Sequence, residues 1–165
     1  MNILHSLFSI LPSQPVYAHC DIPCGIYDPH NMQTASHTVI RMTSMIQDLN
    51  EEDDSEQSEK KYTHQLSRLT KVKEDHAEIL KRELQVLWSD YFKEEHLEKF
   101  PDLHDLVWKT MKLASKTKQE INLDAANELL ENTQKIAEIF FQTKNLEPVR
   151  IPSLYPTEGE IVSHK

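Results

Sequence analysis

Apolar residues recur every three or four positions along most of this chain, which is the spacing of one face of an α-helix. The first series, after Pro29, consists of Met32, Ala35, Val39, Met42, Ile46 and Leu49. Asn31 precedes this series, and asparagine is a favourable residue at a helix N-cap. We therefore expect a first helix that is capped by Asn31 and buries this face.

A second and longer series predicts a helix that opens at Ser58 or Glu59 and ends near Phe92. Its apolar face is formed by Tyr62, Leu66, Leu69, Val72, His76, Leu80, Leu84, Leu87 and Tyr91. The preceding segment, residues 50–59, carries six acidic residues and no apolar one. Such a composition is typical of a solvated loop.

The second half of the chain predicts two more helices and then a tail. Pro101 suits the first turn of the third helix, and Asn122 suits the N-cap of the fourth. Their apolar positions are Leu103, Leu106, Val107, Thr110, Leu113 and Ala114, then Ala126, Leu129, Leu130, Ile136, Ala137 and Phe140. Beyond them, three prolines in residues 145–165 predict an irregular C-terminal tail.

Four amphipathic helices with short connections predict an all-α fold, an antiparallel four-helix bundle. The composition agrees with this, because two glycines in 165 residues leave few tight turns. The net charge of −9 argues against binding to nucleic acid through its phosphates. No apolar run approaches the roughly 20 residues of a membrane span, so no membrane partner is expected.

Candidate chemistry is concentrated in residues 19–29, which read HCDIPCGIYDP. Both cysteines of the chain, Cys20 and Cys24, lie here directly behind His19. The residues alone leave a disulfide, two inert thiols and a metal site open. Structural zinc would need a second pair of Cys or His ligands at suitable spacing, and the chain has no such pair. A di-iron bundle site would need Glu-x-x-His pairs, which are also missing.

A cut after Ala18 would favour the metal site. Residues 1–18 contain no lysine or arginine, whereas a secretory signal starts with positive charge, so we expect a removable pro-segment rather than an export signal. The cut gives His19 a free α-amine beside its imidazole. With the amide and thiol of Cys20 and the thiol of Cys24, these donors favour square-planar Ni(II) or Cu(II).

The stretch HCDIPCGIYDP closely resembles the nickel hook of nickel-containing superoxide dismutases. The segments LWSDYFK (87–93), FPDLHDLV (100–107) and IFFQTK (139–144) are similar to the same family. The resemblance divides the chain into a removable pro-segment (1–18), a nickel-hook and four-helix-bundle domain (19–144) and the tail (145–165). It implies an N-terminal metal-binding hook with one nickel ion per subunit, and a homohexamer.

The resemblance also implies the metal ligands. His19 would supply its amine and an axial imidazole, Cys20 its amide and thiolate, and Cys24 a second thiolate. Tyr27 would screen the open axial face and order water, so that Tyr27 and His19 are the candidate catalytic residues. The residues that would stabilise the hook are Asp21, Pro23 and Gly25.

Further candidates lie outside the hook. Tyr91 and Lys93 would lie near the access route. Many family members have Glu and Arg, a pair that orients the axial imidazole, where this chain has Ala35 and His76. His76 is therefore either a core histidine satisfied by a neighbour or a residue that orients His19.

The expected reaction is conversion of two superoxide ions and two protons to dioxygen and hydrogen peroxide by Ni(II)/Ni(III) cycling. The expected partners are the superoxide anion, a maturation peptidase and further copies of the chain, in the cytoplasm. Two other functions are compatible with the bundle. One is nickel or copper storage and delivery, and the other is a helical interaction module with an inert cysteine pair.

Overall fold

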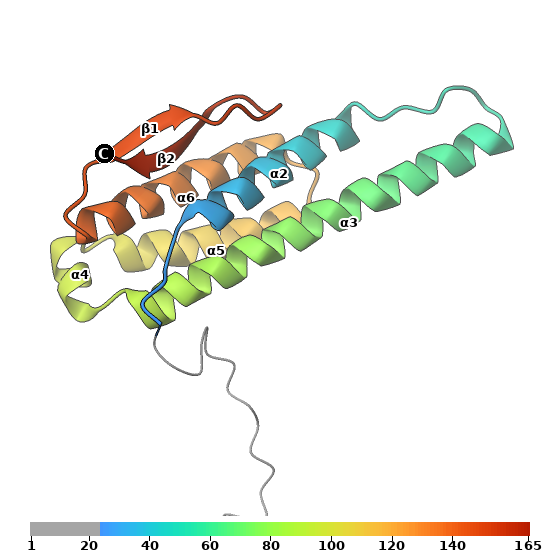
Figure 1. Cartoon of the computed structure of the whole chain (residues 1–165). Coiled ribbons are helices and arrows are strands. Elements are labelled where there is room, and N and C mark those ends of the chain that lie inside the picture. Colours follow the sequence, from blue (N-terminus) through green and yellow to red (C-terminus); the bar gives the residue numbers. More distant parts are fainter. Residues whose placement is uncertain (1–23) are drawn as a thin grey trace, which may run out of the picture.

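The computed structural model describes residues 24–165, in which four long helices pack side by side (Figure 1). They are α2 (His30–Gln47), α3 (Glu56–Val86), α5 (Leu103–Gln119) and α6 (Leu123–Thr143). Helices α2 and α5 each pack against both α3 and α6. Consecutive long helices run in opposite directions (Figure 1), which confirms the predicted antiparallel four-helix bundle. No helix among residues 24–165 combines the length and apolar character needed to cross a membrane.

Helix α3 buries most of its predicted face. Leu69, Leu80 and Leu84 of the predicted series lie in the core, together with Ala77, whereas Val72 is 36% exposed. Helix α3, with 31 residues, is much longer than α2, with 18. The first turns of α3 extend past the end of α2 (Figure 1), so apolar side chains there have little core to cover.

The helix starts were predicted with mixed success. The side-chain oxygen of Asn122 accepts a hydrogen bond from the Ala125 amide at 2.9 Å, so the predicted cap of α6 is confirmed. The predicted cap at Asn31 is wrong, because α2 has already begun at His30. There Asp28 Oδ1 accepts a hydrogen bond from the His30 amide at 2.6 Å, two residues on. Local side-chain bonds of this kind favour a turn at a helix start.

The start of α3 lies within the acidic segment that was predicted to be a loop. Ser55 is the N-cap, and its hydroxyl accepts a hydrogen bond from the Ser58 amide at 3.2 Å. Residues 50–55 are an exposed connection, but Glu56 and the residues after it are helical. Acidic side chains in a first turn are favourable, because they complement the positive end of the helix dipole.

Helix α3 does not end as a regular α-helix. It continues into the π-helical turn η1 (Leu87–Tyr91), in which the Phe92 amide donates to the Leu87 carbonyl, five residues back, at 2.9 Å. The predicted end near Phe92 is therefore confirmed. The sequence did not predict the short helix α4 (Glu94–Lys99), which follows at one end of the bundle (Figure 1).

The prediction of an irregular tail is wrong. Two strands, β1 (Pro148–Pro152) and β2 (Glu160–His164), form an antiparallel hairpin in which Val149 lies opposite Ser163. The prolines were misleading because Pro148 and Pro152 occupy the first and last positions of an edge strand. Such positions tolerate the missing amide hydrogen.

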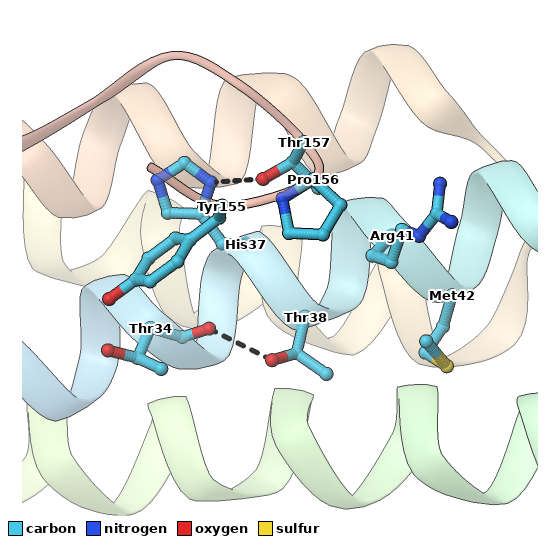
Figure 2. Close-up of a pocket in the computed structure, with 8 residues that line it drawn as sticks. All are labelled: Thr34, His37, Thr38, Arg41, Met42, Tyr155, Pro156 and Thr157. Carbon is cyan, nitrogen blue, oxygen red and sulfur yellow. Dashed lines mark hydrogen bonds between the residues drawn. The ribbon is translucent and has the colours of Figure 1, made fainter. Parts of the chain in front are cut away.

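The hairpin docks on α2 through polar side chains that are themselves buried. The Gln33 side chain donates to the Val162 carbonyl at 3.0 Å and accepts from the Val162 amide at 2.6 Å, as a neighbouring strand would. His37 Nδ1 lies 2.8 Å from Thr157 Oγ1 (Figure 2), and its Nε2 lies 3.1 Å from the Glu160 carbonyl oxygen. Because a carbonyl only accepts, Nε2 carries the hydrogen in this contact.

Candidate metal centre

The structure describes the predicted hook from Cys24 onward, and this part leads directly into α2 (Figure 1). The other residues that were predicted to form the hook lie outside the described residues, and so does the predicted cleavage site after Ala18. These hook residues are His19, Cys20, Asp21 and Pro23. Their roles stay predictions, and the geometry of the site is that of its C-terminal half.

Cys24 presents an exposed side chain at the start of a turn. Its sulfur accepts a hydrogen bond from the Ile26 amide, with an N···S distance of 3.4 Å. Hydrogen bonds donated to a thiolate favour the charged form, which is the form that binds metals. Gly25 between them has φ of +71°, a conformation that favours glycine. Among the described residues, no atom would lie within 4 Å of a Cβ at Gly25, so it is the backbone conformation that favours glycine here.

Tyr27 anchors the described part of the hook on the bundle. Its ring packs on Tyr91, with ring centroids 5.3 Å apart and planes tilted by 51°. Tyr91 comes from η1, and its hydroxyl lies 2.7 Å from Thr143 Oγ1 at the end of α6. The Tyr91 ring also packs on Phe140, at 4.7 Å. Two residues singled out from the sequence, Tyr27 and Tyr91, are therefore in direct contact.

Positive charge lies close to this pair of rings. Lys93 is exposed two residues after Tyr91, and its amide donates to His96 Nδ1 at 3.1 Å. The His96 ring in turn stacks on Tyr91, at 5.6 Å. Lys144 Nζ lies 5.6 Å from the Tyr91 ring centroid and 4.8 Å from that of Phe140. Sequence reasoning gave Lys144 no role, although it ends the IFFQTK segment that signalled the family.

His76 and Ala35 do not form a polar pair. His76 is partly exposed, and its Nδ1 bonds to the Val72 carbonyl of its own helix at 2.9 Å. Ala35 is buried at 1% exposure in the core. The backbone bond satisfies one ring nitrogen of His76, and a role for this residue in orienting His19 stays a prediction.

The described residues offer no complete metal site. Residues 24–165 contain no group of three His, Cys, Asp or Glu side chains that could hold a metal ion. Cys24 is the only cysteine in this part of the chain. A metal centre that uses the Cys24 sulfur therefore needs donors from the residues ahead of it. The predicted hook places nitrogen and sulfur donors there, and this donor set fits nickel.

A separate cavity of about 280 Å³ lies between α2 and the loop of the hairpin (Figure 2). Its lining consists of Thr34, His37, Thr38, Arg41, Met42, Tyr155, Pro156 and Thr157. None of these residues belongs to the hook. The cavity accompanies the docking of the hairpin, and the candidate metal centre is assigned at Cys24.

Comparison with known proteins was made for sequence and for structure. The family model described as nickel-containing superoxide dismutase matches residues 14–144. The superoxide dismutase [Ni] of Streptomyces coelicolor is 37% identical over 142 residues, which cover 86% of this chain and 98% of that protein. The enzyme of the same name from Streptomyces seoulensis gives the same identity and coverage.

Solved structures agree with the sequence match. A native nickel superoxide dismutase structure superposes with a TM-score of 0.65 at 36% identity, covering 76% of this chain and 99% of that one. A structure with nickel ligation of the oxidized state gives a TM-score of 0.66 at 35% identity, covering 77% and 99%. By its family match, its identity to these relatives and its fold, the chain belongs to the nickel-containing superoxide dismutase family.

Proposed function

We propose that the hook ahead of α2 is the nickel centre at which this chain dismutates superoxide. As a member of its family the chain is an oxidoreductase that converts two superoxide ions and two protons to dioxygen and hydrogen peroxide. Its cofactor is nickel, which when bound supplies one-electron cycling between the +2 and +3 states. The residues of the chain must hold the ion, admit a small anion and deliver protons.

We assign the ligands of one nickel ion per subunit to His19, Cys20 and Cys24. The observation that carries this assignment is the turn at Cys24, which exposes the sulfur and directs the Ile26 amide at it. An amine, an amide and two thiolates form a donor set that would suit nickel better than structural zinc, and bound nickel would supply one-electron redox chemistry there. The positive φ of Gly25 supports the tight return of the chain after the second thiolate.

The remaining hook residues are assigned supporting roles. With nickel bound at the hook, Tyr27 would screen the ion from solvent and order water for proton delivery, and His19 would supply its imidazole as a further ligand. The contact of Tyr27 with Tyr91 supports the role of Tyr27, because the contact fixes its ring against the bundle. Asp21 and Pro23 hold the backbone of the hook, through hydrogen bonds and through a restricted φ respectively.

The substrate is an anion, and the chain carries a net charge of −9. Attraction of superoxide must therefore be local and not a property of the whole surface. The lysines beside Tyr91, Lys93 and Lys144, support entry on this side of the hook. Tyr91 contacts Tyr27 of the hook on one hand and lies 5.6 Å, centroid to Nζ, from the Lys144 ammonium on the other.

Maturation, assembly and location complete the proposal. A peptidase removes residues 1–18 and so creates the amine ligand. The family resemblance supports a homohexamer, and large apolar side chains outside the core, Val72, Ile79 and Trp108, give it exposed surface to cover. The absence of lysine and arginine from residues 1–18 supports processing in the cytoplasm and not during export.

The ligand assignment is tested with three chains that differ only in where they begin: at Met1, at Ala18 or at His19. Nickel content, intact mass and superoxide turnover are measured for each chain. We expect only the chain that begins at His19 to bind one nickel per subunit and to turn over. The chain that begins at Ala18 is the matched control, because one extra residue moves the α-amine away from the metal.

Each other outcome has a defined meaning. Full turnover by the chain that begins at Ala18 would remove the His19 amine from the ligand set. Nickel bound without turnover by the trimmed chain would indicate storage or delivery. A trimmed chain with no stoichiometric nickel would leave a helical interaction module with an inert cysteine pair.

A further inference from the structure

The C-terminal hairpin lies beyond the family match, which ends at residue 144. Nothing in the proposed reaction uses it. Yet its second strand runs beside the first turns of α2, the helix into which the hook leads (Figure 1). The hairpin is therefore an addition to the bundle at the end where the candidate metal centre lies.

The strand β2 is fixed to α2 close to the hook. Gln33, one turn after the start of α2, is fully buried, and its side-chain amide makes both hydrogen bonds with the backbone of Val162. A buried side-chain amide whose NH2 group and oxygen are both hydrogen-bonded has one favourable position. Loss of either hydrogen bond would leave a buried polar group unpaired. The first turn of α2 therefore cannot move independently of β2.

The end of β2 also borders the hook itself. A cavity of about 240 Å³ separates Asp28 and His30, at the base of the hook, from the last residues of β2. Its other lining residues are Phe141, Ile161, Val162, Ser163 and His164. Asp28, whose carboxylate accepts a hydrogen bond from the His30 amide, is one of the residues that line this cavity.

A row of aromatic rings joins the end of β2 to the hook. The His164 ring packs on Phe141 at 5.0 Å, and Phe141 packs edge-on against Phe140 at 5.4 Å. Phe140 packs on Tyr91 at 4.7 Å, and Tyr91 packs on Tyr27 at 5.3 Å. Each such contact restricts the positions of its neighbours, because rings in van der Waals contact cannot shift singly.

We propose that the C-terminal hairpin is a positioning element for the hook. It holds the first turn of α2 through Gln33, and it supports Tyr27 through the row of rings that starts at His164. The proposal rests on the function assigned above, but it concerns the shape of the hook, which can be measured without metal. Coupling along the row is measured directly, by changing the ring at His164 and following the hook.

The test compares three variants of the full chain. His164→Ala removes the first ring of the row at an exposed position near the C-terminus, and His164→Phe keeps a ring without the imidazole. Thr157→Val is the matched control, because it removes a hairpin contact at the opposite end of β2. Hydrogen–deuterium exchange of residues 24–30 is followed in each metal-free chain.

We expect His164→Ala to speed exchange in residues 24–30 roughly threefold to tenfold, the effect of one aromatic pair. His164→Phe should restore the original rate. Thr157→Val should speed exchange only in the hairpin. In the trimmed, nickel-loaded chain, His164→Ala should also change the spectrum of the nickel centre and speed nickel release to a chelator.

Three results would overturn the proposal: unchanged exchange in His164→Ala, equal acceleration of the hook by Thr157→Val, or no restoration by His164→Phe. The exchange experiment needs no nickel. It therefore fails or succeeds independently of the nickel and turnover measurements that test the proposed function.

Discussion

The hook and the C-terminal hairpin lie at opposite ends of the chain, meet at α2, and are built by opposite means. The described part of the hook is exposed, with Ile26 at 74% and Cys24 at the surface. What characterises this sequence is the presence of residue types that can bind a metal. The hairpin is held by Gln33 and His37, which are 0% and 3% exposed, and its specificity lies in hydrogen-bond geometry.

This difference separates chemistry from stability. A donor atom of the hook can be changed without opening a cavity or leaving a buried polar group unpaired. A contact of the hairpin can be changed without touching a donor atom. Apart from the coupling through the row of rings proposed above, the two regions should therefore respond to different measurements, and variants in each region test how far that separation holds.

The largest expected effect is the loss of activity in Cys24→Ser. A hydroxyl at this position is not a soft anionic donor, so we expect the trimmed variant to lose dismutase activity entirely. Its free energy of unfolding should change by no more than about 0.5 kcal/mol, as is usual at exposed positions. Activity assays and thermal unfolding check the two halves of this prediction.

Cys20→Ser should behave in the same way as Cys24→Ser, which makes it the companion variant. If either serine variant kept its turnover, the redox chemistry would have to lie elsewhere. A large loss of stability in Cys24→Ser would break the separation between the two regions.

An intermediate effect is expected from acid, and it should appear in the hairpin. Burial lowers the pKa of His37 below its ordinary value of 6.5, although the hydrogen bond to the Glu160 carbonyl opposes the shift. The undocked state therefore binds a proton more readily than the docked state. Docking is fully stable above about pH 6.5 and weakens as the pH falls below it, by at most about 1.4 kcal/mol per pH unit.

Hydrogen exchange of residues 148–164 measures this effect between about pH 7.5 and about pH 5.5, after correction for the intrinsic exchange rate. His37→Gln is the control, because its side chain does not titrate. An equal pH dependence in this variant would assign the effect to other groups.

The smallest expected effect concerns Lys93. Lys93→Glu should lower kcat/KM by roughly twofold to fivefold at low salt, and by less as salt screens the charge. Lys60→Glu, in the first turns of α3, makes the same change in net charge at an exposed position. Equal slowing in both variants would indicate an effect of net charge alone, and an unchanged rate in Lys93→Glu would remove its steering role.

The bundle and the family of the chain were largely readable from the sequence. Helical spacing predicted the long helices because each buries one face against its neighbours. Asn122 was identified as a cap because its oxygen bonds an amide three residues later in its own sequence. The family was recognisable because a metal-binding motif depends on residue types at fixed short spacing.

The features that were missed depend on contacts between distant residues. The hairpin is stabilised by Gln33, which lies 129 positions before Val162 in the sequence. The prolines of residues 145–165, from which an irregular tail was predicted, do not indicate that contact. Val72 was predicted on the buried face, but it is exposed, whereas its neighbour Lys73 is buried and its ammonium donates to the Glu120 carbonyl at 2.7 Å. The contact of Tyr91 with Lys144 likewise appears only when the ends of α3 and α6 meet.

The π-helical turn η1 has a consequence for how the sequence can change in length. It carries one residue more than an α-turn, and each residue of a helix rotates the next one by about 100° around the helix axis. Loss of a single residue between Leu84 and Phe92 would turn Tyr91 away from the ring of Tyr27. Insertions and deletions among related chains should therefore collect in the exposed connection at residues 48–55 and spare the turn that carries Tyr91.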